Sequence, residues 1–466
     1  MWSSRNESLR GGMAGALALV LGAGLGWMVI SGHSKDLLAV AGLLALVAIL
    51  SVPLGVMTQA FVFVSQAFPK AGKFVHGIPL DLGVVLSLVI LAKWGLTALV
   101  SQKYAHVRPR GAYPALLLVW LVWMAYELLA GVLHGAHFTI MVVEGSALGS
   151  APLVGYWIAS LPEALARRVL GISRGALLFI VGFVFIQALL HGQHTAISGL
   201  TVEAGGATGY QAIYGRNNAT NVGLKMVATY QNGNLLGAYL ALAAPLVMLI
   251  QDARWRVGAF GAVLLATILT LSRGAWFSVA LSFLVLAVLS RKDRWAAYTL
   301  LAAAPLLELS SLVMGRLGHS FTTLSGRTAQ YHVLWIALTH DLTIGKFLGW
   351  FVGWGLGGGP SMPGGGQLTN LDSSLAWLYV CSGLVGVALY VAMVWTAVRP
   401  ALGNRVGCIL AAGMCGALLF QMIDGQLFYV PTAWNFWLFV GLAVASTRFG
   451  AEQCTGPGSR RCASVR

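Results

Sequence analysis

Apolar runs of about 20 residues recur along this chain, and an α-helix of that length spans the hydrocarbon core of a bilayer. Hydrophobic residues make up 58% of the sequence and charged residues only 9%, against roughly 25% charged residues in soluble globular proteins. A membrane β-barrel is excluded, because its strands alternate polar and apolar residues and these runs are continuous. The sequence therefore predicts an all-α, polytopic membrane protein.

The apolar runs predict about 12 to 14 transmembrane helices. They cover residues 12–32, 36–67, 80–102, 112–134, 138–161, 173–191, 231–251, 257–271, 275–290, 295–314, 374–398, 406–424 and 429–447. The run at 36–67 is too long for one helix and contains Pro53, so it forms either two short helices or a re-entrant hairpin.

Two long polar segments divide these spans. The predicted parts are an N-terminal bundle (1–191), a polar loop (192–230), central helices with a turn at Arg273 (231–314), a large loop with short helices (315–373), C-terminal helices (374–448) and a basic tail (449–466).

The distribution of Lys and Arg predicts the orientation. If the N-terminus is cytoplasmic, 19 of the 29 Lys and Arg residues fall on the cytoplasmic side and 9 on the other, as the positive-inside rule requires. Both termini are then cytoplasmic, and both long loops and the Arg273 turn face outside. The net charge of +15 is explained by basic cytoplasmic loops, without nucleic acid as a partner.

No cofactor or metal is indicated. The five cysteines include no CxxC pair, and the histidines predicted outside lack the spacing of metal ligands. The glycine run from Gly353 to Gly366 contains a GxGxxG-like match, but it lacks a βαβ context and a following helix.

Arg273 interrupts two apolar runs with almost no loop, in the string Thr270-Leu271-Ser272-Arg273-Gly274-Ala275-Trp276. It is therefore expected at the membrane boundary. It is either an interfacial anchor or an anion-binding residue, since a guanidinium matches phosphate oxygens in a bidentate manner.

Ser325-Gly326-Arg327-Thr328 opens a second motif, which Tyr331, His332 and Trp335 continue at helical spacing. Arg327 falls in the first turn of this predicted amphipathic helix, where its charge opposes the helix dipole. It is either solvated or part of an anion site.

Asn232 and Asn234 belong to a turn that opens the helix at 231–251, and their simplest role is to form that turn and cap. Arg216 and Lys225, upstream, are candidates to add positive charge outside.

Asp372 stands where the large loop meets the span at 374–398. It is an N-cap, a general base at the edge of a low-dielectric site, or both. Glu127 and Glu308 lie in or near spans and are further candidates; Glu308 is expected near the outer end of its helix, within reach of the same cavity.

These motifs, in this order, resemble those of the O-antigen polymerase and O-antigen ligase superfamily of bacterial envelope glycosyltransferases. The resemblance covers about residues 225–390: the turn with two asparagines, the string around Arg273, Ser325-Gly326-Arg327 before Trp335, and Gly355-Leu356-Gly357 leading to Asp372 and Gly383-Leu384-Val385-Gly386. The N-terminal half is similar only in hydropathy.

The resemblance implies a GT-C-like, metal-independent glycosyltransferase of the bacterial inner membrane with a periplasmic active site. Its donor would be an undecaprenyl-diphosphate-linked glycan. Arg273 and Arg327 would stabilise the leaving diphosphate, with Arg216 or Lys225 as a third cation. Asn232, Asn234, Tyr331 and Glu308 would contribute to substrate binding. Other implied partners are membrane lipids and, where chain length is controlled, a chain-length regulator.

Asp372 departs from the resemblance, because ligases of the superfamily usually carry His at this position. A carboxylate still serves as a general base, so the departure favours a polymerase of O-antigen or exopolysaccharide units over a ligase that transfers glycan to lipid A-core or protein. A transporter of lipid-linked glycans is the third alternative. It is disfavoured because charged residues concentrate at the outer boundary rather than at the midplane.

Overall fold

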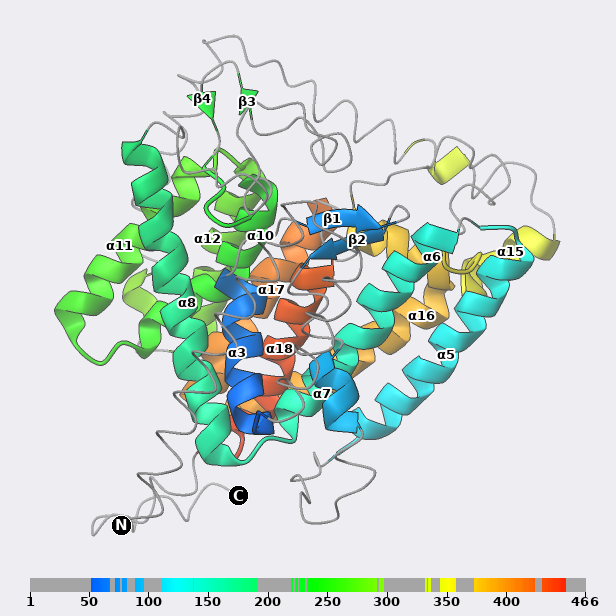
Figure 1. The fold of residues 1–466 in the computed structure, drawn as a ribbon, viewed down its shortest axis with the longest axis horizontal. Coiled ribbons are helices and arrows are strands. Elements are labelled where there is room, and N and C mark those ends of the chain that lie inside the picture. The colour runs from blue at the N-terminus through cyan, green and yellow to red at the C-terminus, as the bar shows by residue number, and fades with distance from the viewer. Residues whose placement is uncertain are drawn as a thin grey trace, which may run out of the picture.

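Helices form most of the structure (Figure 1), a computed structural model. It describes residues 52–67, 72–75, 78–81, 89–95, 111–136, 138–190, 219–220, 223–224, 226–230, 233–290, 293–296, 332, 334–336, 344–357, 373–423 and 430–449. These ranges also contain turns and two antiparallel pairs of short strands, β1 (Gly72–Val75) with β2 (Ile78–Asp81), and β3 (Ala219–Thr220) with β4 (Gly223–Leu224).

The helices follow the chain in an order close to that of the predicted spans. They are α3 (Leu54–Ala67), α5 (Tyr113–Leu133), α6 (Phe138–Gly145), π-helix η1 (Ser146–Ser150), α7 (Ala151–Ala159), α8 (Glu163–Leu189), α10 (Gly233–Ala243), 3-10 helix η2 (Ala244–Leu249), α11 (Ala253–Leu269), α12 (Arg273–Leu289), α15 (Ile344–Val352), α16 (Ser374–Val398), 3-10 helix η4 (Arg399–Gly403), α17 (Arg405–Ile423) and α18 (Val430–Ser446).

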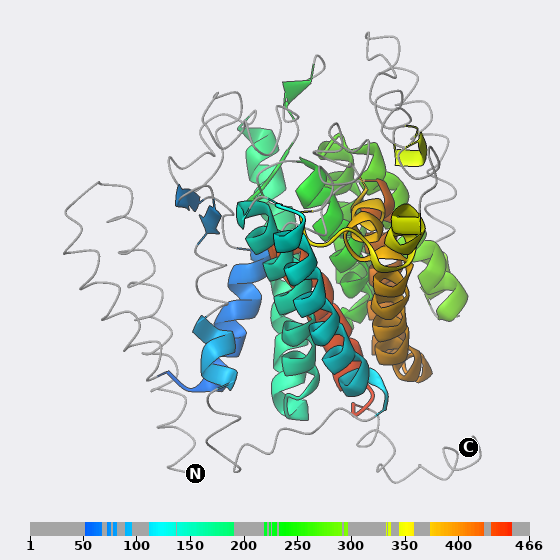
Figure 2. The ribbon, with the colours of Figure 1, turned by 90° about the vertical axis from the view of Figure 1, so that its right-hand side faces the viewer.

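Four helical stretches are long and apolar enough to cross a membrane: Tyr113–Leu133, Glu163–Leu189, Ser374–Gly403 and Arg405–Met422. Four shorter apolar helices accompany them, at Leu54–Ala67, Gly233–Leu249, Arg273–Leu289 and Thr432–Ser446. Figure 2 shows the long helices running in roughly the same direction. The larger predicted count of spans includes segments outside the described residues and stays a prediction.

Several predicted spans have different boundaries in the structure: the first residues of the span predicted at 80–102, for example, belong to β2. The helix predicted at 173–191 begins ten residues earlier, at Glu163, because Pro162 precedes it and Glu163 pairs with Arg167 at 2.6 Å. The span predicted at 138–161 is divided, because the five π-helical residues of η1 separate α6 from α7.

The apolar helix α18 lies in the middle of the bundle and packs against α3, α7, α8, α16 and α17 (Figure 1). Its residues Trp434, Phe436, Trp437, Leu438 and Phe439 are all buried, as expected for a helix that is hydrophobic on every side. Small residues allow the helices to approach closely: a Cβ at Gly441 would meet the Gly155 carbonyl of α7.

Arginines gather at one end of the bundle, where α7, η2, α12 and α18 finish. Their guanidinium groups donate hydrogen bonds to the carbonyl oxygens at or just beyond these helix ends, which the helices themselves leave unpaired. The bonds run from Arg167 to Phe449 (2.8 Å), from Arg448 to Ala159 (2.9 Å) and Leu161 (2.8 Å), from Arg174 to Leu249 (3.3 Å), and from Arg294 to Ala287 (3.3 Å).

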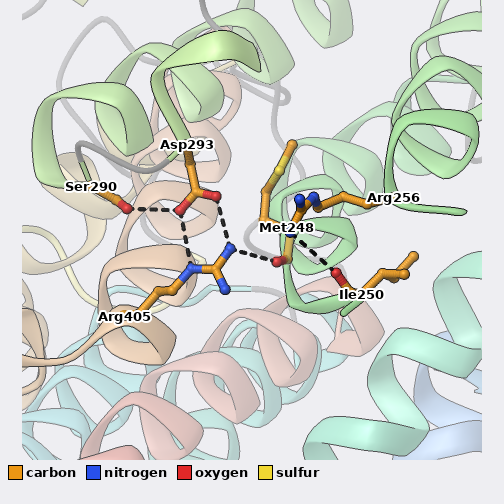
Figure 3. A network of polar contacts seen from close by, with 6 residues as sticks. All are labelled: Met248, Ile250, Arg256, Ser290, Asp293 and Arg405. Carbon is orange, nitrogen blue, oxygen red and sulfur yellow. Dashed lines mark hydrogen bonds and ion pairs between the residues drawn. The ribbon is translucent and has the colours of Figure 1, made fainter. Parts of the chain in front are cut away.

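Arg405 makes the densest of these networks (Figure 3). It donates to the Met248 carbonyl at 2.9 Å and to both carboxylate oxygens of Asp293, at 2.9 and 3.3 Å. Ser290 donates a further bond to Asp293 at 2.7 Å. The Asp293 side chain is only 2% exposed, whereas that of Arg405 is 41% exposed. The ion pair therefore joins α17 to the chain that follows α12, with its negative partner fully desolvated.

This difference in exposure predicts unequal effects of removing the two partners. Arg405→Ala leaves a buried carboxylate without its cation and should destabilise the fold by about 3–5 kcal/mol. Asp293→Ala leaves an arginine that water can reach and should cost only about 1–2 kcal/mol. Thermal unfolding in detergent measures both, with Arg254→Ala, an exposed arginine at the same end, as the control. Equal losses of stability in Arg405→Ala and Asp293→Ala would contradict the burial of Asp293 beside a water-accessible Arg405.

Candidate functional site

The Arg273 string forms a tight turn between α11 and α12, at the end of the bundle opposite the arginine cluster. Thr270 donates a hydrogen bond to the Thr267 carbonyl at 2.7 Å, and the indole of Trp276 donates to the same carbonyl at 3.0 Å. Ser272 is the N-cap of α12 and accepts from the Ala275 amide at 3.4 Å. These polar side chains of the string hold the turn itself.

Leu271 has a φ of +50°, which is unusual for a residue other than glycine. Two residues later, Arg273 opens α12 and its side chain is exposed. The turn therefore presents Arg273 at the first residue of a helix, where the helix dipole and the amides of the first turn also attract anions.

A second helix N-terminus lies beside this turn. α10 packs against α12, and a Cβ at Gly237 would collide with the Ala275 side chain, so the two helices are in close contact within five residues of their starts. Asn234 falls in the first turn of α10 and is half-buried. The structure thus brings two predicted site residues, Asn234 and Arg273, to neighbouring helix starts.

The segment before α10 is fixed against the same turn. The Met226 amide donates to the Leu269 carbonyl at 3.1 Å. The side-chain oxygen of Gln187, near the end of α8, accepts from the amides of Val227 and Ala228 at 2.8 and 2.9 Å. The two motifs, which are separate in the sequence, therefore pack together at the same end of the bundle.

The other predicted site residues lie outside the described residues, and their roles stay predictions. They are Asp372, Arg327, Arg216, Lys225, Asn232, Tyr331 and Glu308. Among the described residues, no group of three His, Cys, Asp or Glu side chains is placed to hold a metal ion.

The glycine loop, residues 353–357, differs most from the expectation drawn from the sequence. The sequence predicts that residues 315–373 face water, but this part of that segment lies between α5, α6 and α16, with Trp354 and Leu356 buried. All five backbone amides of the loop are hydrogen bonded. They donate from Gly353 to Gly349 (2.8 Å), from Trp354 to Val380 (3.0 Å), from Gly355 to Cys381 (3.0 Å), from Leu356 to Glu127 (3.0 Å) and from Gly357 to the Glu144 carboxylate (2.6 Å).

Glycine is required at the two surfaces where this loop meets the helices. Gly355 has a φ of +84°, and a Cβ there would meet the backbone of Gly131 in α5. Gly383, inside α16, has a φ of +58°, and a Cβ there would meet the backbone of Phe351 and Gly353. The glycines therefore permit close backbone packing, which replaces the nucleotide-binding interpretation already rejected from the sequence.

Glu144 of α6 holds both sides of the segment that contains Asp372. One carboxylate oxygen accepts from the Gly357 amide, and the other accepts from the indole N–H of Trp377 at 2.5 Å. The Cys381 thiol lies 3.6 Å from the first oxygen. Gly357 precedes residues 358–372 and Trp377 follows them, so one buried carboxylate fixes the chain at both ends of that segment.

Glu144 was not among the predicted site residues. The available signal was a lone carboxylate within the apolar span at 138–161, a position at which an ionisable residue suggests a specific role. Glu127, which the sequence did single out, is fully buried in α5. Its backbone carbonyl receives the Leu356 amide, so it lines the same loop.

No protein-family model matches this chain, and no curated protein matches it. The resemblance to the O-antigen polymerase and ligase superfamily therefore stays a prediction.

Removal of the Glu144 carboxylate should loosen the glycine loop. Glu144→Ala leaves the Gly357 amide and the Trp377 indole N–H buried without an acceptor, at a cost of about 1–3 kcal/mol each. Glu144→Gln keeps one acceptor oxygen and should lose about half as much. Thermal unfolding in detergent should rank the variants in that order.

Trp377→Phe provides the matched control, because it removes one donor and keeps the ring. If Glu144 binds the indole, the effects of Glu144→Ala and Trp377→Phe on stability will be smaller in combination than their sum. If the two losses of stability add exactly in the double variant, the hydrogen bond between Glu144 and Trp377 is contradicted.

Proposed function

We propose that this chain is a membrane glycosyltransferase that polymerises undecaprenyl-diphosphate-linked oligosaccharide repeat units on the periplasmic face of the bacterial inner membrane. The observation that carries the proposal is the exposed Arg273 at the start of α12, beside the start of α10 with Asn234. Two helix N-termini and a guanidinium at one end of an apolar bundle suit a lipid-linked diphosphate, whose hydrocarbon tail stays in the membrane.

In the proposed reaction, an acceptor sugar hydroxyl attacks the anomeric carbon of the donor glycan. The bond from that carbon to the diphosphate oxygen breaks, and the lipid diphosphate leaves with the bonding electron pair. Arg273 and Arg327 stabilise the charge that develops on the diphosphate, because guanidinium groups beside a leaving diphosphate offset its negative charge. Asp372 accepts the hydroxyl proton as the new glycosidic bond forms. Arg216 or Lys225 adds a third positive charge.

The contacts of Glu144 support the proposed role of Asp372. Asp372 directly precedes Ser373, the N-cap of α16, whose side chain accepts from the Ala376 amide at 3.2 Å. The near end of α16 and the glycine loop are both bonded to Glu144. A general base supplied by a loop is effective only where the surrounding structure holds the loop in place. The contacts of Glu144 hold the described chain before and after residues 358–372.

The test is a polymerisation assay with purified protein and undecaprenyl-diphosphate repeat units. Arg273→Ala should lower the rate by about 10²–10³-fold, which is the usual effect of removing one preorganised electrostatic contact to a transition state. Arg254→Ala, at the opposite end of the bundle, should leave the rate unchanged. Both variants should retain the parent's thermal unfolding midpoint, so that lost activity reports on the site.

The products distinguish the polymerase from the ligase. A ladder formed from repeat units alone supports the polymerase, whereas product formed only when lipid A-core is added supports the ligase. Full activity in each of Arg273→Ala, Arg327→Ala and Asp372→Ala would contradict the proposed site.

A further inference from the structure

Helix α15 presents an apolar face that no other described part of the protein covers. Ile344, Phe347, Leu348 and Phe351 recur at the spacing of one helix face, and they are 82%, 51%, 55% and 40% exposed. Phe347 and Phe351 are in ring contact, with centroids 5.2 Å apart, so the face is continuous along the helix. The sequence predicts a large polar loop at residues 315–373, whereas this part of it is a helix with an apolar exposed face.

The opposite side of α15 packs on the bundle. Gly349 is buried against the ring of Trp354, and Trp350 packs on a buried cluster that includes Trp377, Val380 and Cys381 of α16. Figures 1 and 2 show α15 (yellow) beside the end of α16 where that helix begins. Protein contacts therefore fix which side of α15 faces outward.

The glycine loop that follows α15 sets its depth along the bundle. Leu356 of that loop bonds to the carbonyl of Glu127, which is six residues, roughly 9 Å, before the end of α5. α5 has 21 residues, roughly 31 Å, which matches the thickness of a bilayer core. The loop therefore lies within the apolar part of the bundle, where non-helical backbone is tolerated only when it is buried and hydrogen bonded, as this loop is.

The apolar face also continues onto surfaces of the long apolar helices. At Phe351 the chain meets Gly383 of α16, and the next two residues of that helix, Leu384 and Val385, are 54% and 36% exposed. The end of α5 nearby exposes Leu129 and Val132, and α6 begins with the exposed Phe138. On α5 and α16 the exposed side chains are apolar along the length of each helix, as at Leu118, Val122, Val391 and Trp395.

From this depth and continuity, we infer that α15 lies in the plane of the membrane interface and that its exposed face contacts the acyl chains of one leaflet. Helices of this kind bury their apolar face about 5–10 Å into the boundary between headgroups and chains. Residues 344–357 then form a re-entrant segment: α15 lies along the interface, and the glycine loop returns between α5 and α16 from the level of Gly383 towards Ala136, just beyond the end of α5. The leaflet concerned is the one at the end of the bundle that carries Arg273.

Quenching by lipids that carry a nitroxide tests this inference. Phe347→Cys and Leu348→Cys, each labelled with an environment-sensitive fluorophore in the full-length protein, are reconstituted into phosphatidylcholine vesicles with doxyl groups near or far from the headgroup. Leu128→Cys, on the exposed face of α5, is the lipid-facing control, and Arg254→Cys is the aqueous control. Labelled parent protein gives the background from the native cysteines.

Contact with acyl chains predicts quenching at 347 and 348 at least about twofold stronger than at 254, and stronger from the shallow nitroxide than from the deep one, as for an interfacial helix. Quenching no stronger than at 254, together with strong quenching by aqueous iodide, would overturn the inference in favour of a water-exposed face. Weak quenching by both agents, with fluorophore self-quenching between copies, would overturn it in favour of a dimer interface. None of these outcomes depends on which reaction the protein catalyses.

Discussion

One buried carboxylate determines how the most unusual part of this structure is built. Glu144 accepts hydrogen bonds from the Gly357 amide and the Trp377 indole, so α6, the glycine loop and the start of α16 meet at a single side chain. A charge buried in an apolar bundle is costly unless donors surround it. Here the donors are Gly357 and Trp377, which lie before and after residues 358–372 in the sequence, so the described chain on both sides of that segment is bonded to one side chain.

The second general constraint is the unpaired backbone at helix ends. At one end of the bundle, arginines donate to terminal carbonyls and an ion pair joins Arg405 to Asp293. At the other end, Ser272 and Ser373 cap α12 and α16, and Arg273 opens α12. The excess of Lys and Arg predicted on the cytoplasmic side therefore also has a structural role. Arginines of this group donate hydrogen bonds to carbonyl oxygens at helix ends, which have no partner within the helix.

The sequence allows the helical class to be predicted because continuous apolar runs have few alternatives in a bilayer. It also identified the Arg273 string and the Asn234 turn, whose short polar residues between apolar runs are visible without a structure. Their packing against each other could not be predicted, since it depends on the contact of Gly237 with Ala275 across separate helices. The position of the glycine loop was predicted wrongly in part, because a glycine-rich polar composition does not distinguish a loop in water from one that is buried against helix backbones. Glu144 was not identified from the sequence for a related reason. The two groups that donate hydrogen bonds to its carboxylate lie more than 200 residues away in the sequence.

Hydrogen–deuterium exchange of the glycine loop in the unmodified protein tests the central claim most directly. If residues 353–357 are buried and bonded as described, their amides will exchange as slowly as those of the neighbouring helix α16, at least about 10²-fold more slowly than unstructured peptide. Exchange of these amides at the rate of an open, hydrated loop would show that the segment does not lie between α5 and α16. In that case Glu144 would not fix the chain beside Asp372.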